Sequence, residues 1–186
     1  MKDGLRSQID QLLIQPHNQG KGAAIAKGIS VATGDYMIIQ DADLEYSPTD
    51  YFPLLNCAME TNAKAVYGSR FTKPGKPMGA KWSNYVANKG LTAASNFFTG
   101  QSITDMETCY KLIHRDVYSQ LEIQEKRFGL EPEITAKISG QGVKIEEVPI
   151  SYDARRTSEG KKIGWKDGVS AIRCILKYRG NFKSKR

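Results

Sequence analysis

The sequence predicts an α/β fold in which helices cover the faces of a parallel sheet. Three apolar runs of strand length, residues 12–14, 36–39 and 63–67, alternate with two segments whose apolar residues recur at helical spacing. Strands that alternate with helices at such intervals favour a parallel sheet. Because these folds gather their chemistry at the carboxyl ends of strands, the polar residues that directly follow the runs are the first functional candidates.

The other elements follow from turn signals and apolar spacing. The first helix opens at Gly20 and is closed by Gly34, and the second begins at Ser47 with Pro48 in its first turn. Further helices are expected over 82–98, 132–139 and 165–178, and strands over 109–113 and 143–150. Residues 72–81, rich in Gly, Pro and Lys, are expected to form a mobile lid. We divide the chain into one globular domain, residues 1–164, and an amphipathic basic helix and tail, residues 165–186.

Composition narrows the classes of function. The net charge of +7 points to an anionic partner, which could be nucleic acid, a membrane surface or a phosphorylated substrate. Nucleic acid is disfavoured, because the basic residues are not interleaved with stacking aromatics. Three widely spaced cysteines and two histidines fit neither a disulfide framework nor a zinc site. With no signal peptide and no apolar run near the ~18 residues that cross a bilayer, we expect a cytoplasmic protein, soluble or peripheral to a membrane.

Three carboxylates follow the second apolar run at alternate positions. In an extended segment Asp41, Asp43 and Glu45 would project to one side. Clustered carboxylates repel one another unless a cation neutralises them, and oxygen ligands of this kind suit Mg²⁺ or Mn²⁺. The alternative is a solvated acidic turn, which the position at a strand end makes less favoured.

Basic residues flank this acidic segment in the sequence. Lys21, between Gly20 and Gly22 at a helix start, could face an anion together with backbone N–H groups, or the segment could simply cap the helix. Arg70 follows the third run and could bind phosphate in a bidentate manner, or form a surface ion pair.

A second carboxylate pair and a basic cluster lie further along the chain. Asp105 and Glu107 could orient an acceptor or act as a base, although their spacing alone favours a structural role. Arg155, Lys161 and Lys162 precede the amphipathic helix 165–178. They could form a solvated face or contact anionic lipid or a diphosphate.

Six motifs in this order resemble family-2 glycosyltransferases of the dolichol-phosphate mannose synthase type. They are residues 18–22, 40–46, 68–71, 104–111, 128–134 and 159–165. The resemblance runs over about residues 18–178. It implies a GT-A fold, with a mixed, mainly parallel sheet, and an inverting single-displacement transfer of a sugar from a nucleotide-sugar.

The resemblance also implies roles for individual residues. Asp41 would lie near the nucleoside and Asp43 would bind Mg²⁺ or Mn²⁺, with Glu45 completing the metal set. Arg70 would lie beside the diphosphate or the acceptor phosphate. Arg155 and Lys161 belong to a segment that closes over the site in relatives.

Residues 1–15 do not match the family's first two strands, which hold the nucleotide base and ribose. We therefore expect an N-terminally truncated domain, either as a gene product or with the missing half supplied by another chain. The exposed sheet edge that would result favours homo-oligomers and low activity of this chain alone.

The function predicted from the sequence is transfer of a hexose to polyprenyl phosphate at the cytoplasmic face of a membrane. GDP-mannose is the favoured donor and UDP-glucose the second. The alternatives are a saccharide acceptor on the same fold, or an inactive remnant that binds a nucleotide or a partner protein.

Overall fold

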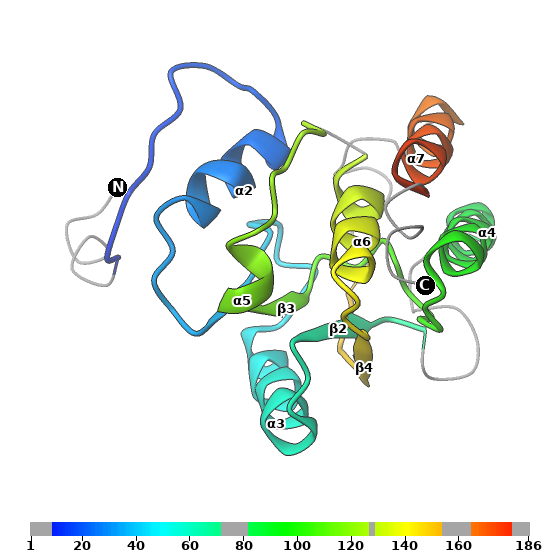
Figure 1. Cartoon of the computed structure of the whole chain (residues 1–186). Helices are drawn as coiled ribbons and strands as arrows, with labels where there is room; N and C mark the ends of the chain where they lie inside the picture. Colours follow the sequence, from blue (N-terminus) through cyan, green and yellow to red (C-terminus); the bar gives the residue numbers. More distant parts are fainter. Residues whose placement is uncertain (1–8, 72–81, 127–128, 154–164, 180–186) are drawn as a thin grey trace.

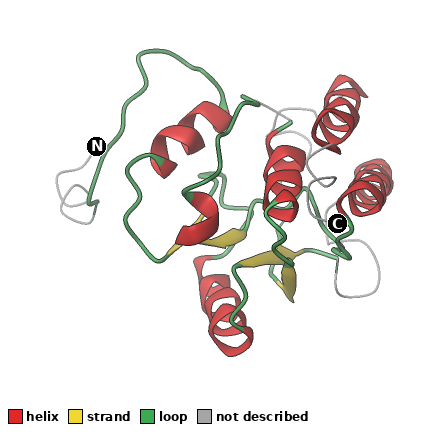
Figure 2. Cartoon of the chain, in the orientation of Figure 1, coloured by secondary structure: helices red, strands yellow, loops and turns green. Residues whose placement is uncertain are grey.

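The structure of the chain, a computed structural model, describes residues 9–71, 82–126, 129–153 and 165–179 (Figure 1). The strands are β1 (Tyr36–Ile38), β2 (Ala65–Ser69), β3 (Lys111–His114) and β4 (Glu146–Pro149). The helices are α2 (Lys21–Ile29), the 3-10 helix η1 (Pro48–Asp50), α3 (Tyr51–Thr61), α4 (Trp82–Thr99), α5 (Arg115–Tyr118), α6 (Leu130–Gly140) and α7 (Trp165–Tyr178). Figure 2 shows the strands lying among these helices.

The four strands form one mixed sheet in the order β1-β3-β2-β4. β3 is antiparallel to both of its neighbours, with Leu112 opposite Ile38 on one side and Val66 on the other. β2 and β4 are parallel, and Gly68 lies opposite Val148. Three of the four strands therefore run in the same direction, which confirms the predicted mixed sheet flanked by helices.

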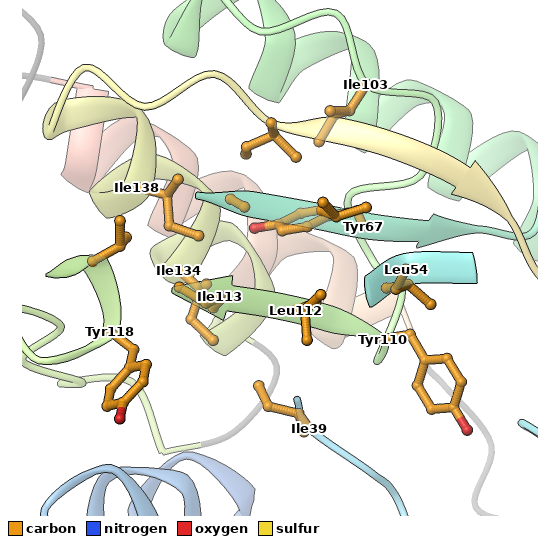
Figure 3. Close-up of a cluster of buried hydrophobic side chains, with 14 of the residues drawn as sticks. Ile39, Leu54, Tyr67, Ile103, Tyr110, Leu112, Ile113, Tyr118, Ile134 and Ile138 are labelled. Atoms are coloured by element: carbon orange, nitrogen blue, oxygen red, sulfur yellow. The ribbon is translucent and has the colours of Figure 1, made fainter. Parts of the chain in front are cut away.

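Helices cover both faces of the central strand β2, whose five residues are all buried. Tyr67 lies at the centre of a cluster that includes Leu54 of α3 and Ile134 and Ile138 of α6 (Figure 3). α7 packs against α6 and α4, and it buries Cys174 and Tyr178. Burial of these apolar side chains on both faces gives the sheet edge a rigid support.

Most of the predicted elements are confirmed with shifted ends. The strands predicted over 36–39, 63–67, 109–113 and 143–150 correspond to β1, β2, β3 and β4, and the helices predicted over 82–98, 132–139 and 165–178 to α4, α6 and α7. The short helix α5 was not predicted; the His114 side chain caps it by accepting a hydrogen bond from the Asp116 N–H at 3.2 Å. The predicted lid, residues 72–81, lies outside the described residues.

Two predictions near the N-terminus are wrong. Residues 12–14 form no strand, and their side chains are 53%, 37% and 73% exposed. An apolar run becomes a strand only where a neighbouring strand pairs its backbone, and among the described residues β1 is an edge strand without such a pairing. The first helix ends at Ile29 with Ser30 as its C-cap, so Gly34 does not close it.

A helix that crosses a bilayer must be both long and apolar. Among the described residues, no helix meets both requirements. The one helix of eighteen residues, α4, contains several polar side chains.

α2 is joined to the loop before α6 through its second residue. The Gly22 N–H donates to the Lys126 carbonyl at 3.1 Å. A Cβ at Gly22 would lie 1.9 Å from the Glu125 carbonyl oxygen, whereas a Cβ at Gly28 would meet nothing within 4 Å. Only a glycine at position 22 allows this close approach.

We expect Gly22→Ala to lower the free energy of unfolding by about 1–3 kcal/mol, because the added methyl group forces the two backbones apart. Gly28→Ala is the matched control in the same helix, and should raise stability by up to about 1 kcal/mol through helix propensity. Urea unfolding followed by circular dichroism measures both. Equal unfolding free energies for the two variants would contradict the contact.

Candidate functional site

Four segments of the chain meet at one edge of the sheet. Since β1, β2 and β4 run in the same direction and β3 runs against them, the carboxyl ends of those three strands lie beside the amino end of β3. The acidic segment 41–45 follows β1, Arg70 follows β2, Asp105 precedes β3 and Tyr152 follows β4. This shared strand direction therefore brings together residues that lie more than one hundred positions apart.

The acidic segment is a turn and not an extended strand. Residues 42–46 form a turn and a bend, and Leu44 has a left-handed φ of 61°. The Asp43 carboxylate accepts from the Glu45 N–H at 3.3 Å. The expectation that the three carboxylates project from an extended segment to one side is therefore wrong, because the turn replaces the two-residue alternation of a strand.

Lys21 lies between carboxylates. Its Nζ is 2.8 Å from Asp41 Oδ2 and 3.1 Å from Glu131 Oε1. Burial opposes the charged amine, but the neighbouring Glu131 and Asp41 carboxylates outweigh it and raise the pKa of Lys21 above its ordinary value. In this arrangement Lys21 links α2 to the acidic segment and to the start of α6.

Arg70 and Asp105 form a buried, bidentate ion pair. Arg70 Nε and Nη2 lie 2.6 and 2.7 Å from the two carboxylate oxygens of Asp105, and the side chains are 9% and 0% exposed. Burial opposes the charged guanidinium, but Asp105 outweighs it and holds the pKa of Arg70 above its ordinary value. Two of the guanidinium donors that could bind a phosphate are thus engaged by Asp105.

Two further ionisable residues lie close to this pair, Glu107, which is half-buried, and Lys111, which is buried. Burial raises the pKa of Glu107 to about 8, and Glu131 adds to the effect while Lys111 and Arg70 oppose it. Its Oε1 is buried without a hydrogen-bond partner. Lys111 Nζ donates to the carbonyls of Met106, at 2.9 Å, and Thr108, and burial lowers its pKa. Glu107 therefore holds its proton to a higher pH than an ordinary carboxyl group does.

Several residues that the sequence analysis did not single out belong to this edge. Glu131 binds Lys21. Its position at a helix start, within the motif 128–134, could have identified it as a site residue from the sequence. Glu147 accepts from the Thr104 and Asp105 N–H groups at 2.7 and 3.1 Å, and the Tyr152 hydroxyl donates to Glu45 at 3.1 Å. No sequence signal distinguishes these two from ordinary strand and loop residues. Arg155 and Lys161 lie outside the described residues.

The balance of charge limits which ligands can bind at this edge. The described side chains considered above comprise seven carboxyl groups and three cations. The carboxyl groups belong to Asp41, Asp43, Glu45, Asp105, Glu107, Glu131 and Glu147, and the cations to Lys21, Arg70 and Lys111. An anionic ligand therefore needs a further cation beside it.

Some of these carboxylates are also candidate ligands of a divalent metal. Within the described residues, no group of three His, Cys, Asp or Glu side chains is arranged to hold a metal ion by itself. Asp41 and Asp43 nevertheless offer hard oxygen donors, and Mg²⁺ commonly binds through one or two carboxylates together with substrate phosphates. The donor set fits a metal that a diphosphate helps to hold.

Comparison with known proteins identifies relatives along most of the chain. Residues 3–122 match the family described as Glycosyl transferase family 2. The chain is 26% identical over 148 residues to a dolichol-phosphate mannosyltransferase of Pyrococcus furiosus, a match that covers 78% of this chain and 41% of that protein. It is 26% identical over 151 residues to a polyprenol monophosphomannose synthase of Mycolicibacterium smegmatis, covering 78% and 57%. The chain thus spans about half the length of these curated relatives.

Solved structures share the fold at lower identity. Glucosyl-3-phosphoglycerate synthase from Mycobacterium tuberculosis, in complex with UDP, superposes with a TM-score of 0.64 at 18% identity, over 91% of this chain and 57% of that one. The same enzyme in complex with Mn²⁺, UDP-glucose and glycerol 3-phosphate gives a TM-score of 0.61 at 17% identity, and this match also covers 91% of this chain and 57% of that one. These neighbours have the GT-A fold, as the resemblance implied. Because the family match covers more than half of its residues, the chain belongs to glycosyl transferase family 2.

Proposed function

We propose that the chain is the catalytic part of a glycosyltransferase that moves a hexose from a nucleotide-sugar to a polyprenyl phosphate, with inversion and with a divalent metal. The main observation behind this proposal is that the acidic turn 41–45 and the Arg70–Asp105 pair lie at one edge of the sheet. The chain also belongs to this family. Relatives named for polyprenol and dolichol phosphate support the acceptor.

The donor that we propose first is GDP-mannose, and UDP-glucose is second. Two relatives are named as mannosyl-transferring enzymes, which favours mannose. A structural neighbour in complex with UDP-glucose supports the second choice. A transfer assay that offers both donors with one short polyprenyl phosphate separates them.

The proposed chemistry places few demands on a catalytic base. An acceptor phosphate is already largely dianionic near neutral pH, since its second pKa is about 6. The difficult step is to bring two anions together and to stabilise the departing nucleoside diphosphate. A metal held by Asp41 and Asp43 would neutralise charge on that diphosphate. Arg70, already held in place by Asp105, would contribute a fixed positive charge.

A saccharide acceptor is the second candidate, and Glu107 is the residue that favours it. A hydroxyl nucleophile needs a base, and a carboxyl group whose pKa burial raises to about 8 is suited to exchange a proton near neutral pH. An assay that offers both a polyprenyl phosphate and a simple sugar to the wild-type chain distinguishes the two acceptors. Product formed only on the sugar would favour this second candidate.

The metal assignment predicts a defect in Asp43→Ala. With GDP present, we expect Mn²⁺ affinity to fall by about tenfold or more, the factor that corresponds to about 1.4 kcal/mol. Calorimetric titration of Mn²⁺ in the presence of GDP measures the change. Asp35→Ala, at the other end of β1 and exposed, is the control. Equal Mn²⁺ affinity in wild type and Asp43→Ala would refute the assignment.

The burial of Glu107 predicts a pH-dependent gain in Glu107→Gln. Between about pH 4.5 and pH 8 the folded chain keeps a proton that the unfolded chain releases, so this group lowers stability as pH rises. A neutral amide removes that loss. We expect the unfolding free energy of the variant, relative to wild type, to rise by on the order of 1 kcal/mol or more from pH 5 to pH 8.

Urea unfolding at both pH values makes this measurement. Glu60→Gln, on the exposed side of α3, is the matched control. A relative stability of Glu107→Gln that is the same at both pH values would show that Glu107 is ionised in the folded chain.

A peripheral membrane contact, at the cytoplasmic face, is the last part of the proposal. Val169, Ile172 and Leu176 of α7 are exposed at spacings of three and four residues, and Arg173 and Lys177 beside them are also exposed. Such a helix suits the surface of an anionic bilayer, where each basic residue contributes about 1 kcal/mol, reduced by salt.

We expect the chain to sediment with anionic vesicles at low salt and to be released by high salt. Arg173→Gln combined with Lys177→Gln should weaken binding by about tenfold or more, given about 1 kcal/mol for each charge. Lys64→Gln, an exposed lysine before β2, is the control. Binding that ignores both lipid charge and salt would contradict this contact.

A further inference from the structure

The turn that carries the acidic residues has a strained backbone at Leu44. Leu44 has φ 61°, a left-handed conformation that costs a residue other than glycine roughly 1–2 kcal/mol. The Leu44 side chain is 90% exposed, so its own packing does not compensate. Strain of this kind persists only where surrounding groups hold the backbone.

Residues after β4 bind the turn at Glu45, the residue that follows Leu44. The Asp153 N–H donates to the Glu45 carbonyl at 3.0 Å, and the Tyr152 hydroxyl donates to Glu45 Oε2 at 3.1 Å. The preceding residue is also attached, because the Ser151 N–H donates to Asp50 Oδ2 at 2.9 Å. Three successive residues, 151–153, thus bind the acidic turn and the helix start that follows it.

Tyr152 also contacts the basic half of the site. Its ring lies 5.1 Å from the Arg70 guanidinium carbon, and the Phe71 ring lies 5.3 Å from that carbon. Asp105 binds the guanidinium edge. One side chain therefore contacts both Glu45 and Arg70, and a phenylalanine in its place could make only the second of these contacts.

We propose that Tyr152 is a positioning residue that holds the acidic turn at one fixed spacing from Arg70, so that a metal-bound nucleoside diphosphate meets both at once. The proposal rests on the proposed function, because it assigns that ligand to the same sheet edge. The hydroxyl binds the acidic turn through Glu45 and also faces the Arg70 guanidinium, near which the ring lies.

The test separates the hydroxyl from the ring. Tyr152→Phe removes the bond to Glu45 and keeps a ring over Arg70. We expect its GDP affinity with Mn²⁺ present to fall by about tenfold, the loss that one hydrogen bond to a charged group can cause. GDP affinity in EDTA should stay within about twofold of wild type, a split that a general loss of stability would not produce. Tyr36→Phe is the control, since the Tyr36 hydroxyl bonds the Ala63 carbonyl at 3.3 Å, away from the turn.

A second measurement needs no ligand. Urea midpoints of wild type, Glu45→Gln, Tyr152→Phe and the double variant form a cycle, and we expect the two shifts to be non-additive because both substitutions alter the same bond. Additive shifts of the midpoints would overturn the role of Tyr152. So would a GDP affinity of Tyr152→Phe that equals that of wild type with Mn²⁺ present, or that falls by the same factor with Mn²⁺ and in EDTA. Wild-type GDP affinity that does not depend on Mn²⁺, with non-additive midpoints, would instead overturn the proposed function and with it the ligand assigned to this turn.

Discussion

The buried ion pair between Arg70 and Asp105 is the interaction on which the rest of the sheet edge depends. It joins the end of β2 to the segment that leads into β3. Glu147 of β4 binds the same segment by accepting a hydrogen bond from the Asp105 N–H. Removing one member of such a pair leaves an uncompensated buried charge, which costs about 3–5 kcal/mol. The pair therefore fixes the relative position of three strands where their functional residues emerge.

This pair changes how the basic composition is interpreted. The chain carries a net charge of +7, which suggests a site rich in free cations. Arg70 is instead engaged by Asp105, and Lys21 by Asp41 and Glu131. The described residues include 14 Lys and Arg against 18 Asp and Glu, so the positive excess of the chain comes from residues outside the described ranges. A site of this composition can bind a diphosphate only with an additional cation, which is the physical reason for proposing a metal.

The sequence by itself determined the α/β class, the main strands and helices, and the acidic segment as a candidate site. These follow from local rules: an apolar run such as 36–39 favours a strand, Pro48 is favoured in the first turn of a helix, and Asp41 and Asp43 follow directly after the apolar run. Each of these conclusions uses neighbours within a few positions. The order of the motifs along the chain was sufficient to identify the family.

Only the tertiary structure decided which residues are partners. Residues 12–14 are as apolar as a strand, but no strand among the described residues pairs with them, because pairing depends on distant backbone. Tyr152 lies 107 positions from Glu45 and 82 from Arg70, and it touches both because β1, β2 and β4 end at the same edge of the sheet. Contacts set by strand order and burial leave no local pattern in the sequence, since the residues that make them are neighbours only after the chain has folded.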